Sequence, residues 1–358
     1  QTPKNTHHSG HKMKSMVLTG IRAMEMKEAP DPQIGGPDRV LLKIEAVGVC
    51  GSDVHYYTTG RIGSQVVQYP YRVGHECSAT VLKTGTAVDS LKPGDRVAVD
   101  PAESCGSCDQ CLAGRFHTCR NLTFLGTPGQ GEGCLCEMIS MPAASCFKVP
   151  DDMTFERAAL IEPLSIGVYS AEFVNLENTA VGILGCGPIG LSVMSAALAG
   201  GCKAVYATDR IDGRLAVADR AGACWTGNPD KTNIVSEIEH REPLFLDAVF
   251  ECCGSQDALD QAVNLLKPGG KLVLVGIPEN DRVSFEIDKL RRREICVQNV
   301  RRQNECVRKA IDLVEWGRID PDFIITHRFP FERAKDAFDM VDKYADGVIK
   351  AMIMREDK

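Results

Sequence analysis

The sequence lacks the features that mark membrane and secreted proteins. No part of its 358 residues approaches the run of about 18 apolar residues that a membrane-spanning helix requires. Near the start, no stretch has the positively charged and then apolar order of a secretory signal peptide. We therefore expect a cytoplasmic protein without a membrane partner.

Positive charge is not in excess either. Lysine and arginine together number 41 against 48 aspartate and glutamate residues, so the net charge at pH 7 is -7. Proteins that bind nucleic acid attract phosphates with a basic surface, and this balance argues against such a partner. A chain of 358 residues is also too long to fold around a single hydrophobic core, so we predict two domains.

Cysteine, in contrast, is abundant, with 16 residues. In a long chain without an export signal, metal-ligating thiolates and buried thiols are expected rather than disulfides. Four cysteines have the spacing C-x2-C-x2-C-x7-C and can fill a tetrahedral zinc shell, which leaves no room for substrate. An iron–sulfur centre or a reduced thiol cluster is the alternative to this predicted structural zinc. The four are Cys105, Cys108, Cys111 and Cys119.

A second set of candidate metal ligands combines different residue types. Cys50 begins the segment CGSDVHY, and 25 positions after it His75 and then Glu76 follow the turn glycine Gly74. A thiolate, an imidazole and a carboxylate suit a catalytic zinc that keeps one position for substrate. Glu162, within LIEPL, is a further candidate ligand. Which acid completes the shell is left open.

The second half contains a dinucleotide-binding pattern. Residues 180–186 predict a buried strand that runs into GCGPIG at 185–190, and an apolar helix follows at 191–198. Gly185 and Gly187 let the backbone turn tightly beside a pyrophosphate, which the N-terminus of the helix then binds. A tight turn without a ligand is the alternative for the motif taken alone.

Asp209 ends the next predicted strand, 19 residues after Gly190. A carboxylate there accepts hydrogen bonds from the ribose hydroxyls and repels a 2′-phosphate, so we expect NAD. Arg210 follows at once and could hold a phosphate, which keeps NADP as the alternative. Arg214 is expected over the adenine or at the helix, with a solvated surface charge as the other interpretation.

Strand and helix patterns then alternate as in a doubly wound parallel sheet. Helices at 304–316 and 332–344 and an apolar run at 348–353 should return the chain to the first half, whose short strands and turns predict a β-rich domain. The predicted division is a flexible tail at 1–15, a β-rich catalytic domain at 16–163 and 300–358, and a cofactor domain at 164–299.

Together these motifs resemble the polyol (sorbitol, xylitol and arabinitol) dehydrogenase branch of the zinc-containing medium-chain dehydrogenases. The resemblance extends over nearly the whole chain and includes the cysteine, Gly-His-Glu, LIEPLS and glycine-rich motifs and THRFP at 326–330. It implies an α/β fold with a GroES-like catalytic domain, a Rossmann domain with a doubly wound parallel sheet, and a homotetramer.

The resemblance also implies roles for single residues. Cys50, His75 and Glu76 match catalytic zinc ligands, and Glu162 matches a carboxylate that binds zinc directly or through water. Ser52 matches the hydroxyl that relays the alcohol proton, His55 the outer end of the relay, and Tyr56 a substrate-pocket aromatic. A capping serine, a surface histidine and a core tyrosine are the alternatives. Expected cofactor contacts are Gly185, Gly187, Ile189, Gly190, Asp209, Arg214, Val275 and Arg301.

One segment departs from the branch. Val300, Arg301 and Arg302 stand where its members usually have Phe-Arg-Tyr. Arg301 matches a polyol-contacting arginine. For Arg302 we favour a side chain that points to the surface, and a place in the substrate site, with a polyol phosphate or sugar acid as substrate, is the alternative.

The expected activity is oxidation of a secondary hydroxyl of a polyol to a ketose, with hydride transfer to NAD. Threonine, a simple secondary alcohol, a sugar acid or a polyol phosphate are alternative substrates. A non-enzymatic dinucleotide sensor is the alternative outside enzymes, and the ligands of a zinc site that can admit substrate argue against it.

Overall fold

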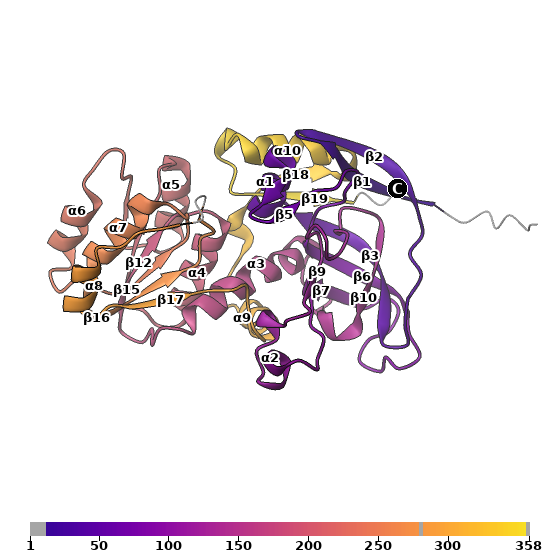
Figure 1. Ribbon diagram of the computed structural model, residues 1–358, viewed down its shortest axis with the longest axis horizontal. Coiled ribbons are helices and arrows are strands. Elements are labelled where there is room, and N and C mark those ends of the chain that lie inside the picture. Colours follow the sequence, from indigo (N-terminus) through magenta and orange to yellow (C-terminus); the bar gives the residue numbers. More distant parts are fainter. Residues whose placement is uncertain (1–11, 279–281, 356–358) are drawn as a thin grey trace, which may run out of the picture.

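A computed structural model of the chain describes residues 12–278 and 282–355. Two lobes lie side by side in Figure 1, and helix α3 (Phe155–Ala171) runs between them. The first lobe combines the indigo and magenta N-terminal half with the yellow C-terminal elements, while the second contains the orange elements. Both ends of the described chain therefore belong to one lobe.

A mostly antiparallel sheet organises the first lobe. Its central strand β3 (Arg39–Gly48) pairs with β6 on one edge and with β10 and β19 on the other. The remaining partners extend this sheet in the order β11-β7-β6-β3-β19-β18. Their bounds are β6 (Glu76–Thr84), β7 (Arg96–Val99), β10 (Met138–Pro142), β11 (Cys146–Lys148), β18 (Ile325–Pro330) and β19 (Lys350–Met354).

Smaller elements surround that sheet. A hairpin packs at its side, two-stranded ladders lie in the loops, and short helices close the lobe. They are β1 (Lys12–Gly20), β2 (Ala23–Pro30), α1 (Gly51–Thr59), β4 (Arg61–Ile62), β5 (Gln65–Val66), β8 (Ala102–Glu103), α2 (Asp109–Leu112), β9 (Thr123–Phe124) and α10 (Ala334–Asp342).

The second lobe is built on a parallel sheet with the strand order β14-β13-β12-β15-β16-β17. This order is that of a Rossmann sheet, so the predicted fold class is confirmed. The strands are β12 (Ala180–Leu184), β13 (Ala204–Thr208), β14 (Trp225–Gly227), β15 (Leu246–Glu251), β16 (Leu266–Leu274) and β17 (Cys296–Asn299). The helices of this lobe are α4 (Pro188–Ala199), α5 (Asp212–Arg220), α6 (Ile234–Arg241), α7 (Gln256–Leu265) and α8 (Ile287–Arg292).

Helix α3 holds the lobes together. Its N-cap Thr154 accepts a hydrogen bond from the backbone N–H of Arg157, which satisfies a donor of the first turn. Residues of α3 share one buried cluster with α4 and with α9 (Val307–Glu315). The expected domain boundary at 163/164 lies inside this helix, and the domain limits remain a prediction.

Several predicted elements have different ends. The flexible tail is wrong for residues 12–15, because β1 begins at Lys12 and pairs with Pro30 across the hairpin; residues 1–11 lie outside the described ranges. Helices α9 and α10 are shorter than predicted. Along 12–278 and 282–355, no helix has both the length and the apolar character needed to cross a membrane.

Candidate active site between the lobes

A cavity of about 650 Å³ lies where the lobes meet. The first lobe lines it with residues of α1, the start of β6 and the segment that follows β17. The second lobe contributes the glycine-rich turn and the ends of β13 and β16. The predicted metal, cofactor and substrate residues therefore share one space.

Three predicted ligands converge at this cavity. Cys50 is the N-cap residue of α1, and His75 and Glu76 lie at the start of β6. The Sγ of Cys50, a ring nitrogen of His75 and a carboxylate oxygen of Glu76 all lie within 4.8 Å of one another. Gly74, at φ 100°, turns the chain into β6, a conformation that favours glycine. A thiol, an imidazole and a carboxylate converging in this way fit zinc.

Two residues missed by the sequence analysis support these ligands. The Asp53 carboxylate lies 3.3 Å from His75 Nδ1, and it also accepts a hydrogen bond from the Gly74 N–H. Burial lowers the pKa of His75, but the nearby Asp53 and Cys50 raise it more, so the pKa lies well above its ordinary value. Lys350 donates hydrogen bonds to both carboxylate oxygens of Glu76 at 2.7 and 2.5 Å.

A sequence signal existed for both residues. Asp53 lies inside the cysteine motif, three residues after Cys50. Lys350 is the charged residue within the apolar run 348–353. A lysine in a buried strand needs a partner for its charge, which could have prompted a search for an acid.

Glu162 lines the same cavity from α3 and is buried. It does not belong to the tight cluster of Cys50, His75 and Glu76 found in the described part of the chain. Burial raises the pKa of Glu162 to about 7. Its place fits a carboxylate that reaches the metal directly or through water, which stays a prediction.

The predicted proton-relay and substrate residues follow Cys50 on α1. Ser52 Oγ lies 3.7 Å from Cys50 Sγ, and His55 is exposed toward the cavity. Ser52 and His55 are three positions apart, so they share one face of the helix. Tyr56 is buried, lines the cavity, and donates from its hydroxyl to Gln65 Oε1 at 2.9 Å.

The glycine-rich turn has the expected close packing. Gly185 has φ 101°, and a Cβ at Gly190 would lie 1.8 Å from the Gly185 carbonyl oxygen, so only glycine fits. At Gly187, the N-cap of α4, a Cβ would meet only Arg214 Nη1, at 3.6 Å. Backbone is therefore open to the cavity at the helix N-terminus, where a pyrophosphate would bind. Ile189 and Val275 also line the cavity.

Asp209 lies beside this turn with both carboxylate oxygens bonded. Oδ2 accepts from the Cys186 N–H at 2.7 Å and Oδ1 accepts from the Ile211 N–H at 2.8 Å. Arg214 Nη1 lies 3.7 Å from Asp209, and its side chain is only 14% exposed, so it is not a solvated surface charge. Arg210, in contrast, is 75% exposed and pairs with Asp230.

The favoured surface position for Arg302 is wrong. Its guanidinium lies 3.4 Å from the centre of the Phe124 ring and lines the cavity together with Arg301. Arg302 has φ 55°, a left-handed conformation. That turn of the backbone, which the sequence did not indicate, directs the segment after β17 along the cavity wall.

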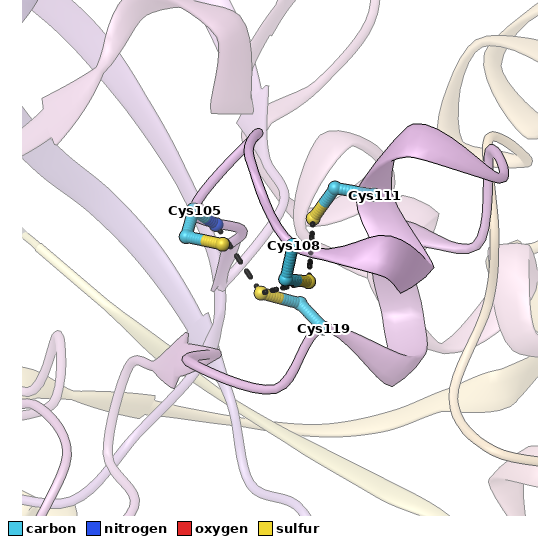
Figure 2. Close-up of side chains that lie close together, drawn as sticks. All are labelled: Cys105, Cys108, Cys111 and Cys119. Atoms are coloured by element: carbon cyan, nitrogen blue, oxygen red, sulfur yellow. Dashed lines mark hydrogen bonds between the residues drawn. The ribbon is translucent and has the colours of Figure 1, made fainter.

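The four-cysteine loop forms a second cluster away from the cavity. Figure 2 shows the side chains of Cys105, Cys108, Cys111 and Cys119 pointing at one another from the loop and α2. Their sulfur atoms lie within 4.8 Å of each other. Backbone N–H groups, first that of Ser107, lower the pKa of Cys105 to about 5, whereas burial raises that of Cys111 to about 11. Four converging sulfurs fit a tetrahedral zinc.

Comparisons with known proteins agree with this geometry. Residues 36–151 match the alcohol dehydrogenase GroES-like domain, and residues 188–316 match the zinc-binding dehydrogenase domain. Sorbitol dehydrogenase of Bacillus subtilis is 34% identical over 97% of this chain and 99% of its own. L-idonate 5-dehydrogenase of Vitis vinifera is 34% identical over 94% of this chain and 93% of its own.

A solved structure extends the similarity to three dimensions. Galactitol-1-phosphate dehydrogenase from Escherichia coli superposes with a TM-score of 0.86 at 29% identity and covers 96% of this chain and 100% of its own. The chain therefore belongs to the zinc-binding dehydrogenases with a GroES-like domain, oxidoreductases that act on a CH–OH group with zinc and a nicotinamide cofactor.

Proposed function

We propose that this enzyme oxidises a secondary hydroxyl of an acyclic polyol to a ketose and transfers the hydride to NAD. The observation that supports this most directly is the shared cavity, which brings the Cys50–His75–Glu76 cluster and the glycine-rich turn to one space. The similarity to sorbitol dehydrogenases supports the polyol as substrate class.

Cys50, His75 and Glu76 would hold the catalytic zinc, with Glu162 as an additional or exchanging carboxylate. When bound, zinc supplies Lewis acidity that lowers the pKa of the substrate hydroxyl. Cys105, Cys108, Cys111 and Cys119 would hold a structural zinc that stabilises their loop.

In the proposed reaction, Ser52 accepts the proton of the substrate hydroxyl and releases its own hydroxyl proton to His55 or to water, which passes it to solvent. The C–H bond of the carbinol carbon breaks with both electrons, and the hydride forms a new C–H bond on the nicotinamide. The products are a ketose, NADH and one proton. Tyr56 and Arg301 orient the polyol, and both lobes exclude bulk water from the cavity.

Specificity for NAD over NADP would come from Asp209. Its carboxylate is buried beside the glycine-rich turn, where it would accept from ribose hydroxyls and repel a 2′-phosphate. Arg210 pairs with Asp230 outside the residues that line the cavity, which leaves it without a defined role toward a phosphate.

The test is a substrate panel with the zinc-loaded enzyme. Sorbitol, xylitol, arabinitol and galactitol, together with threonine and 2-butanol, are offered with NAD and with NADP. We expect the highest kcat/KM with a polyol and NAD. Cys50→Ala should lose turnover, while fluorescence should show that the variant still binds NADH. Preference for threonine or a simple alcohol, or near-normal activity of Cys50→Ala, would contradict the proposal.

Two further properties are part of the proposal. A reducing compartment such as the cytoplasm is supported by the 16 cysteines, all of which are free thiols. The resemblance to polyol dehydrogenases supports a homotetramer. Light scattering coupled to size-exclusion chromatography measures the molar mass and therefore the number of subunits.

A further inference from the structure

Arg302 occupies a defined place next to the predicted metal ligands. Its guanidinium lies 3.4 Å from the centre of the Phe124 ring, and this ring is 5.4 Å from the His75 imidazole, centre to centre. A single aromatic ring therefore separates the charge of Arg302 from the catalytic cluster. Glu162 and Tyr56 line the same cavity as Arg302.

The backbone around Arg302 is held on both sides. The Val300 N–H donates to the Leu274 carbonyl at 2.9 Å, which extends the parallel sheet. Gln303 Nε2 donates to Asp100 Oδ2 at 2.8 Å, and Asn304 Nδ2 donates to the Gly114 carbonyl at 2.9 Å. The side chain is thus presented by a fixed segment, which reduces the entropy lost when it binds a ligand.

No protein acceptor satisfies this guanidinium within residues 12–278 and 282–355. Arg302 makes no hydrogen bond there, no carboxylate oxygen lies within 4 Å, and Nη1 is buried without a partner. Arg39, in contrast, bonds to Glu103, and Arg293 donates to three backbone carbonyls. Arg96 and Arg214 each leave a buried Nε without a partner, but their terminal nitrogens contact the Met153 carbonyl and Asp209. Burying an unpaired charged donor costs free energy unless a ligand supplies the acceptor.

The acids nearest to Arg302 do not provide that acceptor. Asp100 accepts from the Ala102 N–H and from Gln303, and burial raises its pKa to about 6. Glu162 lies close enough to His75 and Glu76 for their charges to shift its pKa, and it makes no ion pair with Arg302 within 4 Å. Burial, followed by the neighbouring charge of Arg301, lowers the pKa of Arg302 to about 9, so the guanidinium remains positively charged at neutral pH.

We propose that Arg302 determines specificity by binding an anionic group, a carboxylate or a phosphate, at one end of the polyol chain whose hydroxyl is oxidised at the cluster. The inference rests on the proposed function and defines its substrate class as anionic polyols. A guanidinium matches the oxyanions of both groups with two parallel N–H donors, which an ammonium does not.

The experiment compares pairs of substrates that differ only at one terminus. Gluconate is paired with sorbitol, galactonate with galactitol, and galactitol 1-phosphate with galactitol, all with the zinc-loaded enzyme and NAD. We expect kcat/KM to be about 10- to 100-fold higher for an anionic member, the range of a charged hydrogen bond. The aldonate and phosphate arms decide which anion is bound.

Two variants of Arg302 and one control variant test whether this arginine causes the preference for anions. Arg302→Gln should lose about 10- to 100-fold in kcat/KM for the anion with little change for the neutral polyol. Arg302→Lys should recover only part of this, since one ammonium cannot form the paired contact. Arg292→Gln, on exposed α8, removes the same charge far from the cavity and should retain the preference.

Binding measured by calorimetry with the enzyme–NADH complex is the second readout. Oxidation of neutral polyols without preference for anions, or an equal loss for both in Arg302→Gln, overturns the inference while the proposed function stands. No turnover with any substrate overturns the proposed function. In that case, tighter binding of anions than of neutral polyols that is lost in Arg302→Gln supports the inference, and equal binding overturns it.

Discussion

Lys350 Nζ lies 2.5 Å from Glu76 Oε2, and both side chains are buried, at 1% and 2% exposure. The same ammonium donates to the Val49 carbonyl next to Cys50. Lys350 begins β19, which pairs with β3 beside the predicted metal ligands. The C-terminal strand thereby fixes a carboxylate of the predicted metal cluster, 274 positions away in the sequence.

Lys350→Met should lower the free energy of unfolding by about 3–5 kcal/mol, because the Glu76 carboxylate would be left buried without its partner. Urea denaturation measures this. The matched control is Lys231→Met, whose ion pair with Asp212 is exposed and should be worth about 0–1 kcal/mol.

The double variant Lys350→Met, Glu76→Gln removes the charge from both partners. It should be more stable than Lys350→Met alone, since no unpaired carboxylate remains buried. Equal, small losses of the free energy of unfolding in Lys350→Met and Lys231→Met would show that the buried ion pair stabilises the fold no more than the exposed one.

Asp53→Asn should weaken zinc at the catalytic cluster by about 10- to 100-fold, because the carboxylate that orients His75 is lost. The readout is zinc retained after dialysis against graded chelator, where we expect about one zinc per chain instead of two. Asp89→Asn, at an exposed position, is the control and should retain both. Unchanged zinc content in Asp53→Asn would argue that Asp53 only supports the Gly74 turn.

Cys111→Ser should release the structural zinc and lower the thermal stability, because the four-cysteine loop loses a ligand that closes the metal shell. Metal analysis and a melting curve measure this. The free thiol Cys296, which is exposed on β17, provides the control Cys296→Ser with no change in zinc. An iron–sulfur centre would instead appear as iron and a visible absorption band in the wild type.

Asp209→Gly should reduce kcat/KM for NAD by about 10- to 100-fold, because charged hydrogen bonds to the ribose are lost, and it should improve the use of NADP. The ratio of the two kcat/KM values is the readout, since a loss of folded protein affects both cofactors equally. Asp230→Asn leaves Arg210 without its exposed partner and should keep the preference for NAD. An unchanged ratio in Asp209→Gly would show that Asp209 does not determine the preference between NAD and NADP.

Short-range motifs were predictable from the sequence because neighbouring residues cannot move far apart. The four cysteines lie within 15 positions, and the glycine-rich turn requires glycine wherever a strand meets a helix this closely, as Gly190 against Gly185 illustrates. The periodicity of strands and helices in the second half likewise predicted its parallel sheet.

Only the tertiary structure decided which distant residues meet at the cluster. The pairing of β19 with β3 brings Lys350 to Glu76, and the left-handed turn at Arg302 brings its guanidinium to Phe124. Local patterns do not encode such contacts, because they depend on strand order and on the packing of the lobes around α3. The sequence by itself determined which reactive side chains the protein has, and the fold determined which charges line the cavity between the lobes.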